Sequence, residues 1–322
     1  MGKFSKLGVT LVTIGALLAG LGLMFKFYAY DRLATIPLDQ STEAVLTDDN
    51  ATFFDADNVG QGTGRLTTTA RVIADKALSE EASVETGRDA VVVKMGQATD
   101  NNDQAPPMDF SERVVALDRH TGEALDWSGN EQNGEPVDYQ GAQVIKFPFN
   151  TQQQDYDYWD GTLGQPVTME YVGTETVEGT DGEIETYKFE TSIPESITST
   201  REVPRGLFGL EDTGAVVADR TYANDRTIWV EPETGVMIKI QEAQKQRLLI
   251  DDEGAVPVQA LDTVSASTDE TVDANIEEYG SKVGVLGAIR TFLPWTLLAI
   301  GLVLILAGVA VSLSSSKKRT EV

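Results

Sequence analysis

LGVTLVTIGALLAGLGLMF at residues 7–25 and FLPWTLLAIGLVLILAGVAVSL at residues 292–313 are the two stretches that decide the architecture. Neither contains a charged side chain. At a rise of ~1.5 Å per residue, about 20 helical residues cross a hydrocarbon core of ~30 Å. The first stretch is longer than the apolar core of a secretory signal, which is about 7–15 residues. We therefore predict two transmembrane α-helices, both retained in the mature chain.

Basic residues beside these stretches set the expected orientation. Lys317, Lys318 and Arg319 follow the second stretch, and Lys3 and Lys6 precede the first. Cytoplasmic flanks are enriched in Lys and Arg. We expect a plasma-membrane protein with both termini in the cytoplasm, divided as follows: 1–27, N-terminus and first transmembrane helix; 28–271, extracytoplasmic domain; 272–291, juxtamembrane amphipathic helix; 292–313, second transmembrane helix; 314–322, basic tail.

Composition excludes several functional classes. The chain has 51 acidic and 25 basic residues, a formal charge of −26. Six of those basic residues and one acid lie at the two ends, which leaves 50 acids and 19 bases, or −31, in the middle. Such a surface repels phosphate backbones, so we expect no nucleic-acid partner. There is no cysteine and a single histidine, His120. We predict no enzymatic activity, no cofactor and no metal-binding residues.

The middle of the chain is predicted to be mainly β, built from antiparallel hairpins in a barrel- or sandwich-like domain. Thr168 to Gly173 alternates polar with apolar residues, GTDG at 179–182 turns the chain, and the alternation resumes at Ile184. Residues 194–204 resemble a loop, and 251–271 an acidic linker. The expected strands are rich in Val, Ile, Thr, Tyr and Phe: 65–74, 90–97, 112–118, 143–147, 167–177 and 184–192.

One helix is expected before the second membrane stretch. Apolar residues recur at helical spacing at Val272, Ile276, Tyr279, Val283 and Leu286. Asp273 and the glutamates at 277 and 278 lie off that stripe. We predict an amphipathic helix over 273–289 that continues into the membrane segment and breaks near residue 294.

Two turns and one acidic loop are the clearest local motifs. DRHTG at 118–122 and EPETG at 231–235 each close a hairpin with a glycine of positive φ, and His120 is expected to be a solvated turn residue. The two turns lie too far apart for the 40–50-residue period of a β-propeller. DYDYWDG at 155–161 begins like a calcium loop, but Trp159 occupies its fifth position. Calcium binding by the acidic loops stays open.

Aromatic residues are concentrated between 139 and 159. Such side chains form packed cores, and they also line apolar ligand cavities. We predict an elongated apolar cavity in the outer domain that opens toward the membrane. Its candidate lining residues are Tyr139, Phe147, Phe149, Tyr156, Tyr158, Trp159 and Trp229.

A family resemblance rests on seven motifs in a fixed order: VVALDRHTGEALDW (114–127), YQGAQVIKFPFNT (139–151), DYDYWD (155–160), MEYVGTETVEG (169–179), TYKFE (186–190), VPRGLFGL (203–210) and RTYANDRTIWVEPETGVMIK (220–239). Together with the two-helix layout, this set resembles an actinobacterial envelope family labelled PorA-type porin. The resemblance implies no catalytic residues. An outer β domain held to the membrane at both ends is also similar in layout to class B scavenger receptors.

Three functional classes compete. We favour an envelope protein whose outer domain binds membrane lipid or an envelope partner protein and supports envelope assembly or transport. A porin or channel component and an extracytoplasmic sensor are the alternatives. Neither membrane stretch carries an internal charge, so a polar conduit would require an oligomer. The oligomeric state stays open.

Overall fold

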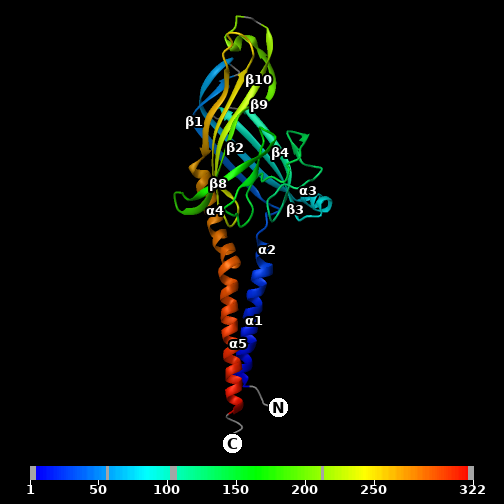
Figure 1. Ribbon diagram of the computed structural model, residues 1–322, viewed down its shortest axis with the longest axis vertical. Helices are drawn as coiled ribbons and strands as arrows, with labels where there is room; N and C mark the ends of the chain where they lie inside the picture. The colour runs from blue at the N-terminus through cyan, green and yellow to red at the C-terminus, as the bar shows by residue number, and fades with distance from the viewer. Residues whose placement is uncertain (1–4, 56–57, 102–106, 212–213, 318–322) are drawn as a thin grey trace. The chain divides into compact units, whose positions relative to one another are not determined.

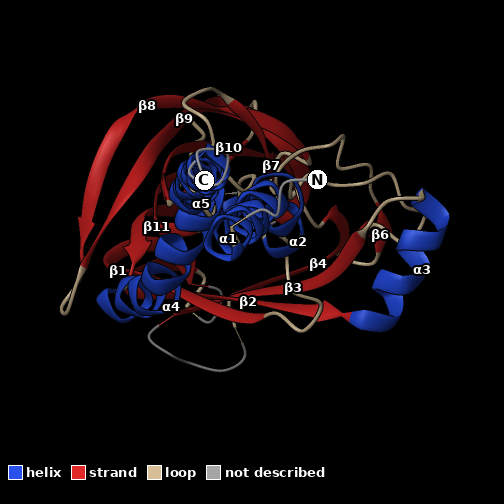
Figure 2. Ribbon diagram, turned by 90° about the horizontal axis from the view of Figure 1, so that it is seen from below, coloured by secondary structure: helices blue, strands red, loops and turns tan. Residues whose placement is uncertain are grey.

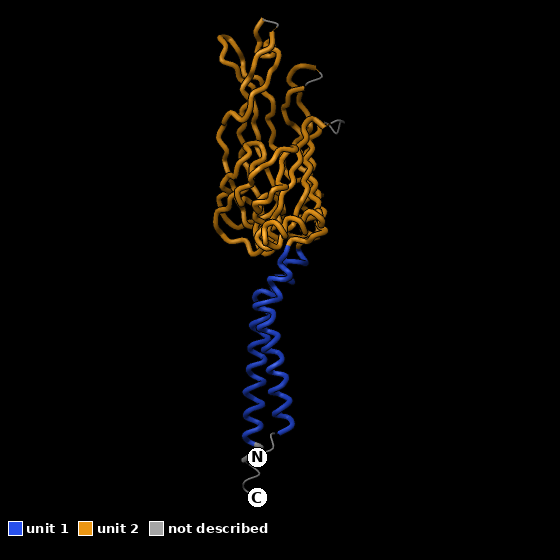
Figure 3. Tube along the Cα trace, turned by 90° about the vertical axis from the view of Figure 1, so that its right-hand side faces the viewer, with its two compact units in different colours: residues 1–35, 280–322 blue, residues 36–279 orange. Residues whose placement is uncertain are grey.

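The chain forms two compact units. A computed structural model describes residues 5–55, 58–101, 107–211 and 214–317. Residues 1–35 and 280–322 make up the first unit, called here the membrane unit, and residues 36–279 make up the second, called the barrel unit (Figure 3). Each unit is described by itself.

The membrane unit is a pair of long apolar helices. α1 is Lys6–Met24 and α5 is Leu293–Lys317, and the two pack against one another along their length (Figure 1). Both belong to helices long and apolar enough to cross a membrane. Short elements continue each helix: a π-helical turn at Phe25–Ala29 and α2 at Tyr30–Leu33 after α1, and a π-helical turn at Ala288–Phe292 before α5.

Glycines bring the backbones of α1 and α5 into contact. Gly8, Gly15 and Gly22 recur every seven residues on α1 and are buried. A Cβ built on Gly15 would lie 2.5 Å from the carbonyl oxygen of Gly301, and one on Gly308 would lie 2.6 Å from that of Gly8. No side chain larger than hydrogen fits at these distances. The seven-residue repeat keeps the small residues on one face of a left-handed helix pair.

The barrel unit contains a 12-stranded sheet in which every neighbouring pair is antiparallel. The order is β6-β5-β4-β3-β2-β1-β12-β11-β10-β9-β8-β7, so two meanders of six strands meet where β1 pairs with β12. Figure 2 shows the sheet curving round, with β8, β9 and β10 on one side and β2, β3 and β4 on the other. The strand bounds are Ser41–Asp55, Gly60–Asp75, Ala90–Asn101, Asp109–Asp118, Glu131–Gln132, Glu135–Pro136, Tyr156–Asp160, Gln165–Glu178, Glu183–Pro204, Ala215–Val230, Met237–Leu249 and Val258–Ser267 for β1 to β12 in order.

Irregular segments close the sheet into a barrel. Leu117 of β4 forms a bridge with Ala124, Glu123 with Gln143, and Gln143 in turn with Tyr158 of β7. Backbone hydrogen bonds follow this path, including Gln143 N–H to the Asp157 carbonyl at 2.9 Å. This path connects β7, at one end of the sheet order, with β4 near the other end, and so covers the sheet edges over this stretch.

Two helices contact the barrel from outside, the first along its length and the second at its first turns. α3, Lys76–Thr86, begins at an Asp75 cap and ends at Gly87, and its Ala82 packs on Ala90 and Val92 of β3. α4, Asp269–Gly287, is tied to the barrel at its first turns. There the Asp273 carboxylate accepts hydrogen bonds from the backbone and hydroxyl of Thr180, at 2.7 and 2.6 Å.

Two apolar clusters fill part of the barrel. The first contains Val93, Val115 and Leu117 from β3 and β4 together with Tyr139 and Trp159. The second consists of Phe147, Met169, Phe189, Ile228 and Val230. The segment around 139–149 supplies side chains to both clusters, so it packs between the two meanders inside the barrel.

The predicted fold class is confirmed: a mainly antiparallel β domain lies in the chain between two long apolar helices. The amphipathic helix is observed as α4. The expected break near residue 294 is not: α4 continues through the π-helical turn at 288–292 directly into α5. Residues 102–106, between β3 and β4, lie outside the described residues.

Three further local expectations were wrong. Residues 194–204 belong to β9, because Pro194 falls at a register shift opposite Tyr222 and Asn224, where a strand tolerates proline. The expected linker contains β12, whose buried face carries Thr263 and Ser265 rather than apolar residues. The expected strand 143–147 forms bridges only at Gln143.

Candidate functional site

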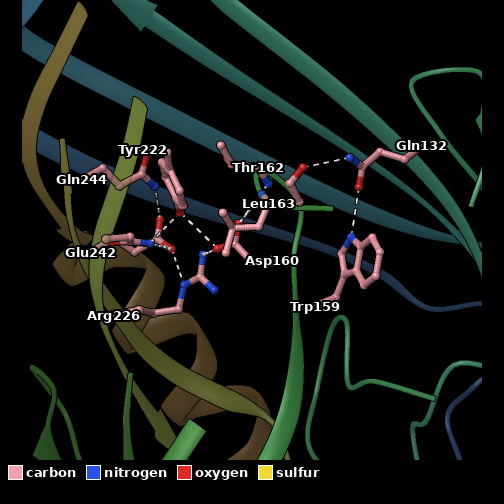
Figure 4. A network of polar contacts seen from close by, with 11 residues as sticks. Gln132, Trp159, Asp160, Thr162, Leu163, Tyr222, Arg226, Glu242 and Gln244 are labelled. Carbon is pink, nitrogen blue, oxygen red and sulfur yellow. Dashed lines mark hydrogen bonds and ion pairs between the residues drawn. The ribbon is translucent and has the colours of Figure 1, made fainter. Parts of the chain in front are cut away.

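A buried ion network lies inside the barrel (Figure 4). Arg226 of β10 donates from Nη2 to Asp160 Oδ2 at 2.9 Å and from Nε to the Glu242 carboxylate. The Asp160 side chain is 0% exposed and that of Arg226 is 10% exposed. Asp160 ends β7, and Glu242 lies opposite Arg226 on β11. The register therefore places three charges from three strands at one level of the interior.

Neutral polar groups complete the network. The Tyr222 hydroxyl donates to Asp160 Oδ2 and the Asn224 amide donates to that hydroxyl, both at 3.0 Å. Gln244 donates to the second Glu242 oxygen at 2.9 Å. Residues 222, 224 and 226 are buried, whereas Asp225 between them is exposed. The inner face of β10 is thus polar over this stretch.

The network is electrostatically coupled. Burial by itself lowers the pKa of Arg226, but the Glu242 and Asp160 carboxylates outweigh it and raise that pKa above its ordinary value. Burial raises the pKa of Tyr222. Arg226 is therefore a permanent cation and Tyr222 a permanent hydroxyl donor. Two buried polar atoms, Arg226 Nη1 and Asn224 Oδ1, have no hydrogen-bond partner among the described residues.

Further hydrogen bonds connect β7 with β5, where the barrel closes. Trp159 donates from its indole nitrogen to the Gln132 side chain at 3.0 Å, and Gln132 donates to the Gly161 carbonyl at 2.8 Å. A Cβ on Gly161 would lie 2.2 Å from Arg113 Nη2. A side chain at residue 161 would therefore displace the Arg113 guanidinium, which lies directly on the backbone that follows β7.

Lys146 is a second buried charge-bearing residue. Its Nζ is buried without a hydrogen-bond partner in the described part of the chain and lies 3.4 Å from the centroid of the Phe149 ring. Burial holds the pKa of Lys146 well below its ordinary value, and the Glu231 charge opposes that shift only in part. Burial raises the pKa of Glu231.

The two predicted turns are built alike. Asp118 Oδ1 accepts from the backbone N–H groups of His120 and Thr121, at 2.8 and 3.0 Å. Glu231 accepts from the corresponding groups of Glu233 and Thr234, at 2.8 and 2.7 Å. Gly122 and Gly235 have φ of 74° and 72°. His120 is half-exposed on its turn, 3.7 Å from Asp89, as a solvated turn residue would be.

The candidate cavity-lining aromatics fall into separate groups. Tyr139 and Trp159 meet edge to face at 4.8 Å in the first apolar cluster. Phe147, Tyr156 and Tyr158 belong to the second, where Phe147 stacks on Phe189 at 4.7 Å. These ring contacts are those of a packed core. The cavity among them stays a prediction.

Two of the candidates lie apart from the second cluster. Phe149 packs on the first cluster from its edge, beside Lys146. Trp229 alternates with the inward-facing Ile228 and Val230 on β10, and its ring lies between the ammonium groups of Lys188 and Lys239, at 5.5 and 4.9 Å. The structure therefore does not bring Trp229 to the other six.

The acids of the suspected calcium loop have different partners. Asp155 accepts from the Tyr171 backbone at 3.0 Å, Asp157 from the Thr168 hydroxyl at 3.2 Å, and Asp160 lies in the ion network. Over the residues that the structure describes, no group of three or more His, Cys, Asp or Glu side chains could hold a metal ion.

Sequence reasoning missed the ion network. Arg226 and Asn224 lie in one of the family motifs, but their inward direction depends on the strand register, and their partners Asp160 and Glu242 are 66 and 16 residues from Arg226. One signal was available: in YANDR at 222–226, large polar residues occupy every second position. This alternation predicts a buried polar face only if the sheet is already known to close into a barrel.

Comparisons with known proteins give the family. The family model described as Porin PorA matches residues 7–310. A protein named Porin PorA from Corynebacterium amycolatum is 23% identical over 310 residues, covering 77% of this chain and 79% of that protein. Another Porin PorA, from Corynebacterium resistens, is 25% identical over 281 residues, covering 68% of this chain and 66% of that protein. The chain belongs to the PorA porin family.

Proposed function

We propose that this is a two-span cell-envelope protein whose barrel unit binds an amphiphile or an envelope partner and supports envelope assembly or transport. Both termini are cytoplasmic and the barrel lies outside, in accord with the basic residues beyond the second span. The protein is not an enzyme in this proposal. It uses the helices for membrane attachment and the barrel for binding.

The outer wall of the barrel supports attachment by helices rather than by strands. Exposed ion pairs cross it between neighbouring strands, such as Arg71 with Glu43 and Arg65 with Asp49. A charged Lys or Arg on the lipid face of a membrane barrel costs about 2–4 kcal/mol at the midplane. These strands are therefore suited to water on their outer side.

The observation that carries the binding proposal is the amphipathic interior. Arg226 and Asn224 present an unused donor and an unused acceptor, and the Arg226 guanidinium lies 5.5 Å from the Tyr158 ring. Tyr158 in turn stacks on Phe147 at 6.1 Å. A ligand with a polar head and an apolar body would meet both surfaces at this place.

Replacing one interior acceptor tests this proposal. Asn224→Leu, nearly isosteric, removes Oδ1, and we expect less co-purified amphiphile per full-length chain in native mass spectrometry. Thr227→Leu on the outer side of β10 is the matched control and should change nothing. Equal amphiphile content in both variants and the parent protein would leave a protein partner as the remaining form of the proposal.

A channel component is the second candidate, favoured by the name Porin PorA of both relatives. Because neither span has an internal charge, several helix pairs would have to assemble around a polar path. Planar-bilayer conductance of the purified full chain separates the two proposals. We expect no unitary conductance; reproducible steps that disappear in Gly15→Val would favour the channel.

A further inference from the structure

One end of the membrane unit carries aromatic and basic side chains together. We call residues 25–33 and 288–296 the collar. Its two segments follow α1 and lead into α5, where the apolar stretches end. The first segment has two basic residues and one acid, and the second has one basic residue, which gives a net charge of +2. Its aromatic residues are Phe25, Phe27, Tyr28, Tyr30, Phe292 and Trp295.

Most of the large rings of the collar are turned away from the helix pair. Phe27 is 72% exposed, Tyr28 56%, Phe292 70% and Trp295 63%. Exposing rings of this size to water is unfavourable, whereas they are favoured at the boundary between lipid tails and headgroups. The position of the collar at the end of both apolar stretches coincides with that boundary.

Two cations are held beside these rings. The Lys26 ammonium lies 5.9 Å from the centroid of the Trp295 ring, across the helix pair, and the Arg32 guanidinium lies 5.1 Å from that of Tyr28. Both basic residues are exposed. Each long side chain therefore has an apolar stem along the collar and a charged end available to an anion.

Paired helix irregularities shape the collar. The π-helical turns Phe25–Ala29 and Ala288–Phe292 contact one another, so the two helices are widened at the same level. Such turns are rare and occur frequently at functional sites. Here each carries one basic residue, Lys26 in the first and Arg290 in the second.

Charge separates the two units of the chain. The membrane unit has nine basic and two acidic residues, or +7, and the barrel unit has 16 basic and 49 acidic residues, or −33; the two sum to the −26 of the whole chain. A negatively charged ligand is therefore repelled by the barrel and attracted by the membrane unit. The exposed rings would contact an apolar portion of the same ligand.

We propose that the collar binds the headgroup phosphate of an anionic phospholipid through Lys26 and Arg32, with the acyl chains lying along the helix pair beyond Phe27 and Phe292. The site is separate from the barrel interior and extends the proposed function. It would hold an acidic protein at an anionic membrane surface, which otherwise repels it. Each basic side chain near such a surface contributes roughly a factor of five in affinity.

The test measures lipid retained by the full-length chain. The protein is reconstituted with equal parts phosphatidylglycerol and phosphatidylcholine, extracted in mild detergent and weighed by native mass spectrometry. We expect preferential retention of phosphatidylglycerol by the parent protein. Lys26→Gln with Arg32→Gln should lower that preference about tenfold or more. Lys76→Gln with Lys245→Gln, an equal charge change on exposed barrel residues, should leave it unchanged.

Further arms decide between the remaining explanations. Lys26→Arg with Arg32→Lys should keep the preference, which shows that charge at these positions is sufficient. Soluble glycerol phosphate at the lipid concentration should not compete. Equal retention in the collar and barrel variants, no preference between the two lipids, or full competition by glycerol phosphate would each overturn the proposal.

Discussion

At the scale of single residues, the barrel keeps charge where most cores are apolar. Arg226 has two carboxylate partners, so its buried charge is compensated. Lys146 forms no ion pair with any described residue: the Phe149 ring lies beside its ammonium, and the Glu231 charge compensates for burial only in part. A buried ion pair is weak evidence of stability, but removing one partner leaves an uncompensated charge. The two residues should therefore respond to substitution in opposite directions.

Arg226→Met should destabilise the protein by about 3–5 kcal/mol, because Asp160 is then buried without its cation. Adding Asp160→Asn should restore part of that loss, since the amide can still accept from Thr162 and donate to Tyr222. Urea unfolding of the full chain in detergent gives the double-mutant cycle. Arg65→Met, at an exposed pair with Asp49, should change stability by at most ~0.5 kcal/mol. Additive effects at 160 and 226 would contradict the coupling.

Lys146→Met should stabilise the protein at pH 7. The folded-state pKa of Lys146 is lowered, so between that value and its ordinary pKa the unfolded chain binds more protons. Stability of the parent protein therefore rises with pH across this window and falls as pH decreases. The advantage of the Met variant should shrink between pH 7 and pH 10. Lys245→Met, at an exposed lysine, should show no such trend; a gap that stays constant would rule out the buried ammonium as its cause.

At the scale of elements, the sequence pattern predicted helices and strands best where the buried face is apolar throughout. The spans at 7–25 and 292–313 are apolar on all sides, so length alone identifies α1 and α5. The strands around 90–97 and 112–118 have buried apolar faces and were predicted from residue type. β12 was not, because Thr263 and Ser265 face the interior. Closure through Gln143 depends on single bridges that no periodic pattern encodes.

Gly15→Val should disrupt the helix pair, and Gly20→Val should not. At Gly15 a Cβ would lie 2.5 Å from the Gly301 carbonyl oxygen and 2.9 Å from the backbone nitrogen of Ile305, whereas at Gly20 it meets nothing within 4 Å. Both substitutions have the same cost in helix propensity, so the difference reports packing. The readout is cross-linking by a bifunctional maleimide between cysteines introduced at Lys26 and Trp295, whose side chains lie near one another across the helix pair. Equal yields in the two valine variants would refute the close contact.

At the scale of the whole molecule, charge and hydropathy assign different environments to different parts of one chain. The apolar helices bear small residues toward each other, and the strands bear ion pairs outward. A membrane protein of this family therefore need not expose its strands to lipid. The ion network could not be assembled from any one motif either, since it needs side chains from β7, β10 and β11.

Topology is the prediction that fixes where the barrel works. The chain has no cysteine, so single cysteines report location without background. Val84→Cys lies at a residue that is 87% exposed on α3, and a membrane-impermeant maleimide should label it in intact cells. Ser314→Cys, in the last turns of α5 just after the apolar stretch 292–313, should react only after the membrane is opened, because the basic residues that follow it favour the cytoplasmic side. Labelling of residue 314 in intact cells, or of residue 84 only after opening, would reverse the orientation. The barrel would then face the cytoplasm, and a role in the envelope would no longer follow from its position.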